Sequence, residues 1–163
     1  MEEWVDIVDE TNKVVDSVSR SQMRKQQLWH RASYIVIQNS AGLLYVQKRT
    51  ATKDYCPSMF DACCGGVMQS GEDALLSATR ELAEEMGIKN VPLTDHGWFQ
   101  YHDEHNHVWG ALYSCTYDGA LSLQEEEVEF VELLSFDEIL KRAKEFTPDS
   151  LLAIQRWHDL LSM

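Results

Sequence analysis

Residues 66–88 read GVMQSGEDALLSATRELAEEMGI and contain the most specific pattern in the chain. Gly66 is followed at a fixed distance by Glu72, and the run RELAEEMGI then occupies residues 80–88. At an average usage of about 7% for each residue type, seven specified positions coincide by chance on the order of once in 10⁸ starts. The spacing therefore indicates a functional motif and does not follow from composition alone.

The same stretch predicts a helix with defined ends. Small and acidic residues at 70–73 favour a helix start, because free backbone amides and the helix dipole attract them there. Gly87 is suited to a left-handed cap at the other end. Helical spacing predicts an apolar face made of Leu75, Ala78, Leu82 and Met86.

Three glutamates of this helix, Glu81, Glu84 and Glu85, are related as i, i+3 and i+4 and should project from one face. Like charges at this spacing repel one another, and clustered carboxylate oxygens suit Mg²⁺ or Mn²⁺. A solvated acidic face is the alternative for a short glutamate run. The fixed spacing of these glutamates from Gly66, Glu72 and Arg80 favours a metal site. In it, Arg80 is expected to orient the carboxylates by pairing with Glu72.

The stretch matches the Nudix box at every defined position, namely Gly66, Glu72, Arg80, Glu81, Leu82, Glu84, Glu85, Gly87 and Ile88. The chain thus resembles the Nudix (MutT-like) hydrolase superfamily. The resemblance implies an α/β fold, the α/β/α sandwich with a mixed sheet in which the box forms a loop, a helix and a loop. It also implies Mg²⁺-dependent hydrolysis of a nucleoside diphosphate linked to another moiety X, or of a related diphosphate metabolite. The carbonyl of Gly66 is an implied metal ligand.

Two positions are candidates for the general base that activates water. Glu81 is the first choice, and Glu81, Glu84 and Glu85 are expected to be needed jointly, because metal ligands and base share one cluster. In many Nudix hydrolases a carboxylate outside the box completes the metal site or acts as base, and one of Glu125, Glu126 or Glu127 can fill that role here. Glu127 is the expected extra metal ligand, with a solvated acidic loop as the alternative. A low-turnover nucleotide-binding sensor is the second functional hypothesis.

The segment upstream of the box provides candidate substrate-binding groups. Gly65 and Gly66 let the backbone approach a metal ion or phosphate closely. Arg49 and Lys53 lie at a predicted strand end and in the loop that follows, where an acidic protein needs cations to hold a diphosphate. Ordinary surface charge is the alternative for both cations.

The wider pattern resembles the branch of the superfamily that contains isopentenyl diphosphate isomerase. Its parts are WVDIVDE, HRA, QKRT and KDYCP, followed by the box. In this alignment Arg49 and Lys53 fall where the isomerase holds diphosphate, and His30 falls on one of its metal histidines. The catalytic cysteine of the isomerase, however, falls on Gly65, with Cys64 one residue out of register. Isomerase-like activity is therefore the alternative, and hydrolysis is favoured.

The remaining histidines raise a separate question. His105 and His107 would share one strand face if their segment were extended, and together with His30 they suggest a second, transition-metal site. No fourth ligand is fixed by spacing, so surface or hairpin histidines are the competing interpretation.

Composition sets the outer limits. One domain over residues 1–163 is expected from this length, and 44% hydrophobic residues suffice for a core. The net charge of −13 argues against broad nucleic-acid or anionic-membrane binding, but not against a phosphorylated small molecule. The N-terminus lacks a signal-peptide core and no membrane-length apolar run occurs, so a cytoplasmic protein with reduced cysteines is expected. A homodimer is common in the superfamily, but nothing in the sequence specifies one.

Periodicity and turn residues predict strands interleaved with a few helices. Strands are expected at residues 4–8, 14–18, 32–38, 43–48, 60–64, 98–102, 108–117 and 127–133. Helices are expected at the box, from Ser19 or Ser21 to residue 28, and after residues 135 and 147. Cys63 and Cys64 are adjacent, so they should point to opposite faces of their strand.

Overall fold

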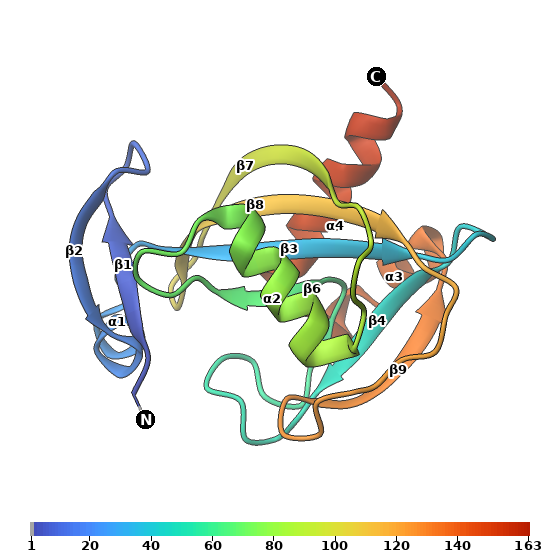
Figure 1. Ribbon diagram of the computed structural model, residues 1–163, viewed down its shortest axis with the longest axis horizontal. Helices are drawn as coiled ribbons and strands as arrows, with labels where there is room; N and C mark the ends of the chain where they lie inside the picture. The colour runs from blue at the N-terminus through green and yellow to red at the C-terminus, as the bar shows by residue number, and fades with distance from the viewer. Residues whose placement is uncertain (1) are drawn as a thin grey trace.

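A mixed β-sheet lies between helices in the computed structural model, which describes residues 2–163 (Figure 1). The strands are β1 (Trp4–Val8), β2 (Val14–Ser19), β3 (His30–Gln38), β4 (Leu44–Arg49), β5 (Phe60–Asp61), β6 (Cys64–Val67), β7 (Thr94–His102), β8 (His107–Thr116) and β9 (Val128–Leu134). The helices are α1 (Arg20–Gln26), α2 (Ala74–Met86), α3 (Phe136–Lys141), the 3₁₀ turn η1 (Ala143–Glu145) and α4 (Pro148–Leu161). The predicted helices and most of the predicted strands are confirmed, with most ends within two residues. The strand predicted at residues 98–102 begins earlier, at Thr94, and the strand predicted at residues 60–64 is divided.

Strand β3 is the centre of the sheet. It pairs in parallel with β8 along its whole length and antiparallel with β6 on its other edge. Strand β7 extends the sheet beyond β8, while β4 pairs with β9 and β5. Helices cover β3 on both faces of the sheet, which explains its nearly continuous apolar sequence.

Alternate residues of β3 pack against helices on opposite faces of the sheet. Tyr34 and Val36 belong to the core shared with α3 and α4, whereas Ile35 and Ile37 belong to the core shared with α2. Figure 1 shows α2 in front of the sheet and α4 behind it. The predicted α/β/α sandwich is therefore confirmed.

Helix α2 has the ends that the sequence predicts. The Asp73 side chain accepts a hydrogen bond from the amide of Leu76, and Gly87 closes the helix with a φ of 70°. Ala78, Leu82 and Met86 are buried, each contributing a few kcal/mol at most by removal of apolar surface from water. The assignment of Leu75 to the buried face was wrong: the residue is 53% exposed, and the buried face of α2 begins only at Ser77.

The single strand predicted over residues 60–64 is two strands. β5 pairs with β4, while β6 pairs with β3, so the chain must cross between neighbours at residues 62–63. The crossing is fixed by hydrogen bonds from the Ala62 amide to Ser150 Oγ (3.1 Å) and from the Cys63 amide to Asp61 Oδ1 (3.0 Å). Cys63 and Cys64 do face the two different cores, as expected.

The N-terminal hairpin and α1 pack together on one end of the sheet (Figure 1). Their own small core contains Val5, Ile7, Val18 and Met23 and continues into Val67 of β6. Helix α1 is capped by Ser19 and ends at Gln26 rather than residue 28, because Gln27 takes a left-handed conformation. This docking places the basic side of α1 beside the loop at residues 50–58. No helix within residues 2–163 is long and apolar enough to cross a membrane.

Candidate active site

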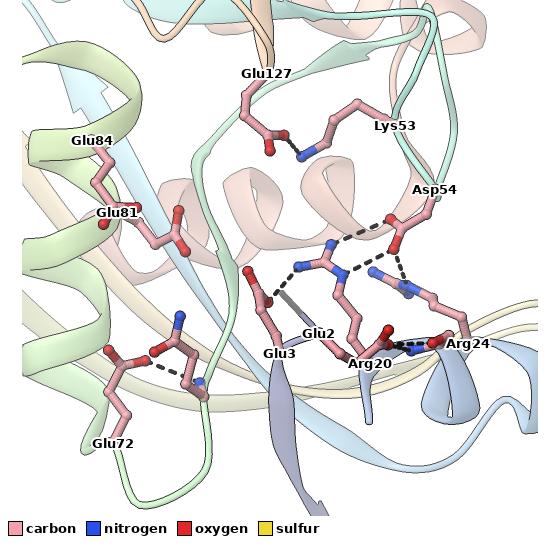
Figure 2. A network of polar contacts seen from close by, with 12 residues as sticks. Glu2, Glu3, Arg20, Arg24, Lys53, Asp54, Glu72, Glu81, Glu84 and Glu127 are labelled. Carbon is pink, nitrogen blue, oxygen red and sulfur yellow. Dashed lines mark hydrogen bonds and ion pairs between the residues drawn. The ribbon is translucent and has the colours of Figure 1, made fainter. Parts of the chain in front are cut away.

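The predicted metal-binding residues line one cavity. Gly66, Glu81, Glu84, Glu85 and Glu127 all border a space of about 250 Å³, together with Arg80 and Lys53. Four of the five come from the box, and Glu127 precedes β9 on the opposite wall. Figure 2 shows Glu81 and Glu84 projecting from α2 and Glu127 across from them. The fold thus brings together residues that the sequence separates by up to 61 positions.

The backbone at Gly66 lies directly against the Glu81 carboxylate. A Cβ atom at this position would lie 2.8 Å from Glu81 Oε1, so a larger side chain would displace the carboxylate. Its neighbour Gly65 is required for a different reason. A Cβ there would lie 1.9 Å from the carbonyl oxygen of Ser33, and its φ of 151° disfavours other residues. Two glycines therefore permit the close approach of β6 to both β3 and α2.

Within the box, Arg80 connects α2 to the loop before the helix, through the predicted pairing with Glu72. Its Nε lies 2.6 Å from Glu72 Oε2 and its Nη2 lies 3.0 Å from Glu72 Oε1. Its Nη1 contacts Glu81 Oε1 at 3.1 Å and Glu84 Oε2 at 3.2 Å. Burial alone would raise the pKa of Glu72, but hydrogen bonds from Arg80 and from the Gln69 amide outweigh it and lower that pKa. One guanidinium thus holds three carboxylates in place.

Glu85 is the buried member of the acidic face, with only 5% of its surface exposed. Gln47 Nε2 donates to it at 3.3 Å, and Cys64 Sγ lies 3.5 Å from the same carboxylate oxygen. Burial and the neighbouring charge of Glu81 raise the pKa of Glu85 to about 8, and burial also raises the pKa of Glu81. Two adjacent buried carboxylates are costly as anions, and a divalent cation between them offsets that repulsion.

The carboxylates of this site are held by cationic side chains. Arg80 pairs with Glu81 and Glu84. Lys53 forms an ion pair with Glu127, as Figure 2 shows. Accordingly, no three His, Cys, Asp or Glu side chains within residues 2–163 converge in metal-binding geometry. The donor set nevertheless has the oxygen chemistry that Mg²⁺ prefers, and Gly66 borders the same cavity. The chemistry of these donors therefore fits Mg²⁺.

Arg49 is a largely buried cation with three hydrogen bonds inside the protein. Its guanidinium donates to Asp61 Oδ2 at 3.1 Å and to the carbonyl of Tyr55 at 2.8 and 3.1 Å. It borders a second cavity, which continues inward from Gly65 and Gly66. Both predicted diphosphate-binding cations border this second cavity, and Lys53 also borders the cavity that contains the glutamates.

Two cations near the cavity were not predicted. Arg20 donates to Asp54 Oδ2 at 2.9 Å and to Glu3 Oε2 at 3.1 Å, and it borders the same cavity as the box glutamates. Arg24 Nε lies 3.6 Å from Asp54 Oδ2. Figure 2 shows both arginines reaching from α1 toward the residue 50–58 loop. The basic run in this short helix was the only sequence signal, and it gave no indication of which surface the helix would face.

The histidines do not form a site together. His30 is buried with Nδ1 at 3.0 Å from the Leu28 carbonyl oxygen, and burial followed by the charge of Arg24 lowers its pKa to about 3. His105 lies in the turn after Asp103 rather than in a strand, so it does not share a strand face with His107. His107 packs edge-on against Trp29, with ring centroids 5.1 Å apart. The interpretation of a shared strand face was wrong, because the chain turns there.

The fold and this site define the class of protein. The NUDIX domain model matches residues 28–154, and the chain belongs to the Nudix family. Nudix hydrolases act on acid anhydrides in phosphorus-containing substrates and generally use divalent metal ions such as Mg²⁺.

Particular relatives extend this assignment over nearly the whole chain. It is 53% identical over 155 residues to a protein named uncharacterized Nudix hydrolase YfcD of Salmonella typhi, covering 95% of this chain and 84% of that protein. A Nudix hydrolase of Pseudomonas aeruginosa is 37% identical over 154 residues, covering 93% and 91%. The crystal structure of DR0079 from Deinococcus radiodurans superposes with a TM-score of 0.83 at 23% identity, covering 94% of this chain and 98% of that one. An Ap4A hydrolase of C. elegans has a TM-score of 0.61 at 20% identity, covering 80% and 98%. Both structures show the shared fold.

Proposed function

We propose that this protein is a Mg²⁺-dependent hydrolase that cuts the diphosphate bond of a nucleoside diphosphate linked to another moiety X, or of a related metabolite. The observation that carries the proposal is the single cavity bordered by Gly66, Glu81, Glu84, Glu85 and Glu127. These residues would hold Mg²⁺ or Mn²⁺ through oxygen atoms, which is the coordination those ions favour. Bound there, the metal supplies charge neutralisation of the diphosphate and a lowered pKa for attacking water.

Glu81 is the proposed general base. Its carboxylate lies directly against the backbone of Gly66, and burial raises its pKa, which makes the carboxylate a stronger base. Glu125 and Glu126 are exposed, which makes them weaker candidates. Glu127 is held by Lys53 on the far wall, which suits a ligand or a phosphate-orienting pair.

Cations around the cavity would hold the substrate. Lys53 and Arg20 border the space beside the glutamates, and Arg49 borders the continuation past Gly65. In-line attack requires the phosphorus to stay fixed between water and leaving group, and positive side chains on two sides restrict its movement. Because Arg20 comes from the N-terminal helix, we propose that residues 1–163 act as one domain.

The isomerase alternative depends on Cys64. Its thiol is buried beneath α2, with Sγ 3.5 Å from Glu85 Oε1. Burial, followed by the charges of Glu85 and Glu81, raises the pKa of the thiol well above its usual value. A thiol in this position is a packing group beside the metal site, so hydrolysis is the better supported function.

The test is hydrolysis of a panel of diphosphate metabolites with Mg²⁺ in ¹⁸O-water. Glu85→Gln should abolish turnover while the protein stays folded, because it removes a ligand charge and keeps the side-chain shape. Glu104→Gln, an exposed glutamate of the β7–β8 turn, is the matched control and should retain activity. Incorporation of ¹⁸O into a phosphate product by the parent protein identifies the phosphorus attacked. Mg²⁺ binding without turnover of any panel member would favour the sensor hypothesis, and unchanged kcat in Glu85→Gln would contradict the assignment.

A further inference from the structure

A third cavity, the hairpin cavity, adjoins the metal site on the side of the N-terminal hairpin. It has a volume of about 420 Å³ and is bordered by Glu2, Glu3, Trp4, Gln69 and Ser70. Glu3 and Gln69 also border the cavity that contains the glutamates, so the two cavities adjoin each other. A cavity of this size can hold a small organic group, since ligand pockets have volumes of about 300–1,000 Å³. A substrate whose diphosphate lies at the glutamates can therefore extend one end toward the hairpin.

Hydrogen bonds hold the hairpin against the loop between β6 and α2. The Ser70 amide donates to the Trp4 carbonyl oxygen at 2.8 Å, and the Gly71 amide donates to Asp6 Oδ2 at 3.1 Å. The hydroxyl oxygens of Ser17 and Ser70 lie 2.5 Å apart. Figure 1 shows this loop beside β1. The two walls of the hairpin cavity are therefore fixed relative to each other.

The same loop is tied to the metal site. Gln69 pairs with Val5 of β1 in an isolated β-bridge, and its amide donates to Glu72 Oε1 at 3.0 Å. Glu72 is held in turn by Arg80, which also contacts Glu81. Direct contacts thus connect the hairpin to the metal-binding helix. A group bound at the hairpin would have a defined position relative to a diphosphate bound at the glutamates.

Trp4 is the aromatic side chain of the hairpin cavity. Burial alternates at the start of β1, where Val5 lies in the hairpin core and Trp4 lies on the other face with 57% of its surface exposed. A flat ring that stacks on the indole would remove apolar surface of both partners from water. Stacking of a nucleobase on an aromatic side chain strengthens binding by about 10-fold or more.

The polar residues of the hairpin cavity favour a neutral group beside Trp4. Glu3 Oε2 accepts from Arg20 Nη1 at 3.1 Å, as Figure 2 shows, and Glu2 Oε1 accepts from the Ser21 amide at 3.0 Å. None of the described residues that border this cavity is a lysine or an arginine. A phosphate would therefore face two carboxylates without a cation of the cavity itself. A nucleobase instead has a neutral ring for stacking and a polar edge for hydrogen bonds.

We infer that the hairpin cavity binds the nucleobase of the substrate and that Trp4 is its stacking surface. This inference rests on the proposed hydrolase function of the adjoining metal site, and it specifies which segment holds the nucleoside end. Trp4 precedes residues 28–154, which match the family model. Recognition of the base thus comes from a hairpin outside the shared domain, while the metal-binding residues lie inside it.

Binding of hydrolysis-resistant probes tests this inference. The probes are the α,β-methylene diphosphates of adenosine, guanosine, cytidine and uridine, together with ribose 5-methylenediphosphonate, which has no base. In calorimetric titration with Mg²⁺, at least one nucleoside probe should bind about 10-fold more tightly than the probe without a base. Trp4→Leu should remove this difference and leave the affinity for the probe without a base unchanged. Trp4→Phe should keep most of the difference, because it retains an aromatic ring.

Trp98→Leu is the matched control, because it changes another exposed tryptophan, which borders neither the hairpin cavity nor the cavity of the glutamates. It should change no affinity. Equal affinity of the parent protein for all five probes, equal losses for every probe in Trp4→Leu, or no binding of any probe would overturn the inference. Circular dichroism checks that the variants are folded, and Trp4→Gln takes the place of a Trp4→Leu protein that is not.

Hydrolysis of the cleavable diphosphates of the same nucleosides and of ribose 5-diphosphate is measured separately. Equal rates with and without a base would retain the proposed function and reject the base-binding cavity. Base-dependent binding that Trp4→Leu abolishes, without hydrolysis of any of these compounds, would support the cavity and count against the proposed function.

Discussion

Arg80 donates two hydrogen bonds to the Glu72 carboxylate, from Nε to one oxygen at 2.6 Å and from Nη2 to the other at 3.0 Å. Glu72 also accepts from the Gln69 amide at 3.0 Å, so the pair fixes the loop before α2 to the helix itself. The remaining nitrogen of Arg80 is then directed at Glu81 and Glu84. The planar guanidinium can bind both oxygens of Glu72 and still contact Glu81 and Glu84, which an ammonium group cannot do.

Arg80→Lys should therefore lower kcat/KM about 10-fold or more although the positive charge is kept. The reason is loss of the two-point contact that positions the metal-binding carboxylates. The control is Arg142→Lys, which changes another arginine that bridges two glutamates, Glu132 and Glu145, far from the box. Steady-state kinetics at saturating Mg²⁺ measures both variants, and equal effects in the two would argue against a positioning role for Arg80.

The box could be predicted because its information is local. Spacing along one helix places Glu81, Glu84 and Glu85 on one face, and the ends of α2 follow from Asp73 and Gly87. The layers of the sandwich follow from the apolar run in β3. Each of these features depends on residues within a few positions of one another.

The inner part of the site could not be predicted, because its residues meet only through tertiary docking. Arg24 reaches the cavity because α1 packs beside the residue 50–58 loop, and Asn106 reaches it from the β7–β8 turn. The split of residues 60–64 into two strands depends on a hydrogen bond from Ala62 to Ser150, 88 residues away. No local pattern encodes contacts at such separations.

Gly66→Ala should lower kcat about 100-fold with little loss of stability. The new methyl group would lie 2.8 Å from Glu81 Oε1, and the flexible end of Glu81 can move aside, which misplaces a reacting group by a fraction of an ångström or more. Gly42→Ala is the control with the opposite expectation. Its new methyl group would have no atom within 4 Å, but the φ of 84° at this position is unfavourable for alanine. It should lower the free energy of unfolding by about 1 kcal/mol and leave kcat unchanged. An active Gly66→Ala enzyme would show that Glu81 tolerates displacement.

Glu127→Gln distinguishes a metal ligand from a partner of Lys53. We expect the Mg²⁺ concentration for half-maximal activity to rise about 10-fold, because an anionic oxygen ligand is lost from the wall opposite α2. Glu126→Gln should behave as the parent protein, because its side chain is exposed and only its carbonyl oxygen is engaged, by Thr50 Oγ1 at 2.9 Å. A higher KM for the substrate with an unchanged Mg²⁺ dependence would mean that Glu127 acts only by holding Lys53.

His30→Gln should make the fold less sensitive to acid. Burial and the charge of Arg24 lower the pKa of folded His30 to about 3, whereas an unfolded histidine titrates near 6.5. Between these values the unfolded chain binds a proton that the folded chain does not, so stability falls as the pH drops below 6.5. From pH 7.5 to pH 5 this histidine alone should account for about 2 kcal/mol of lost unfolding free energy.

Denaturant unfolding at both pH values measures the difference. The glutamine substitution would remove the share of the loss that His30 causes, while its side-chain amide keeps a donor for the Leu28 carbonyl. His105→Gln, in an exposed turn, should leave the loss as it is in the parent protein. An identical loss in both variants would show that His30 becomes protonated without unfolding.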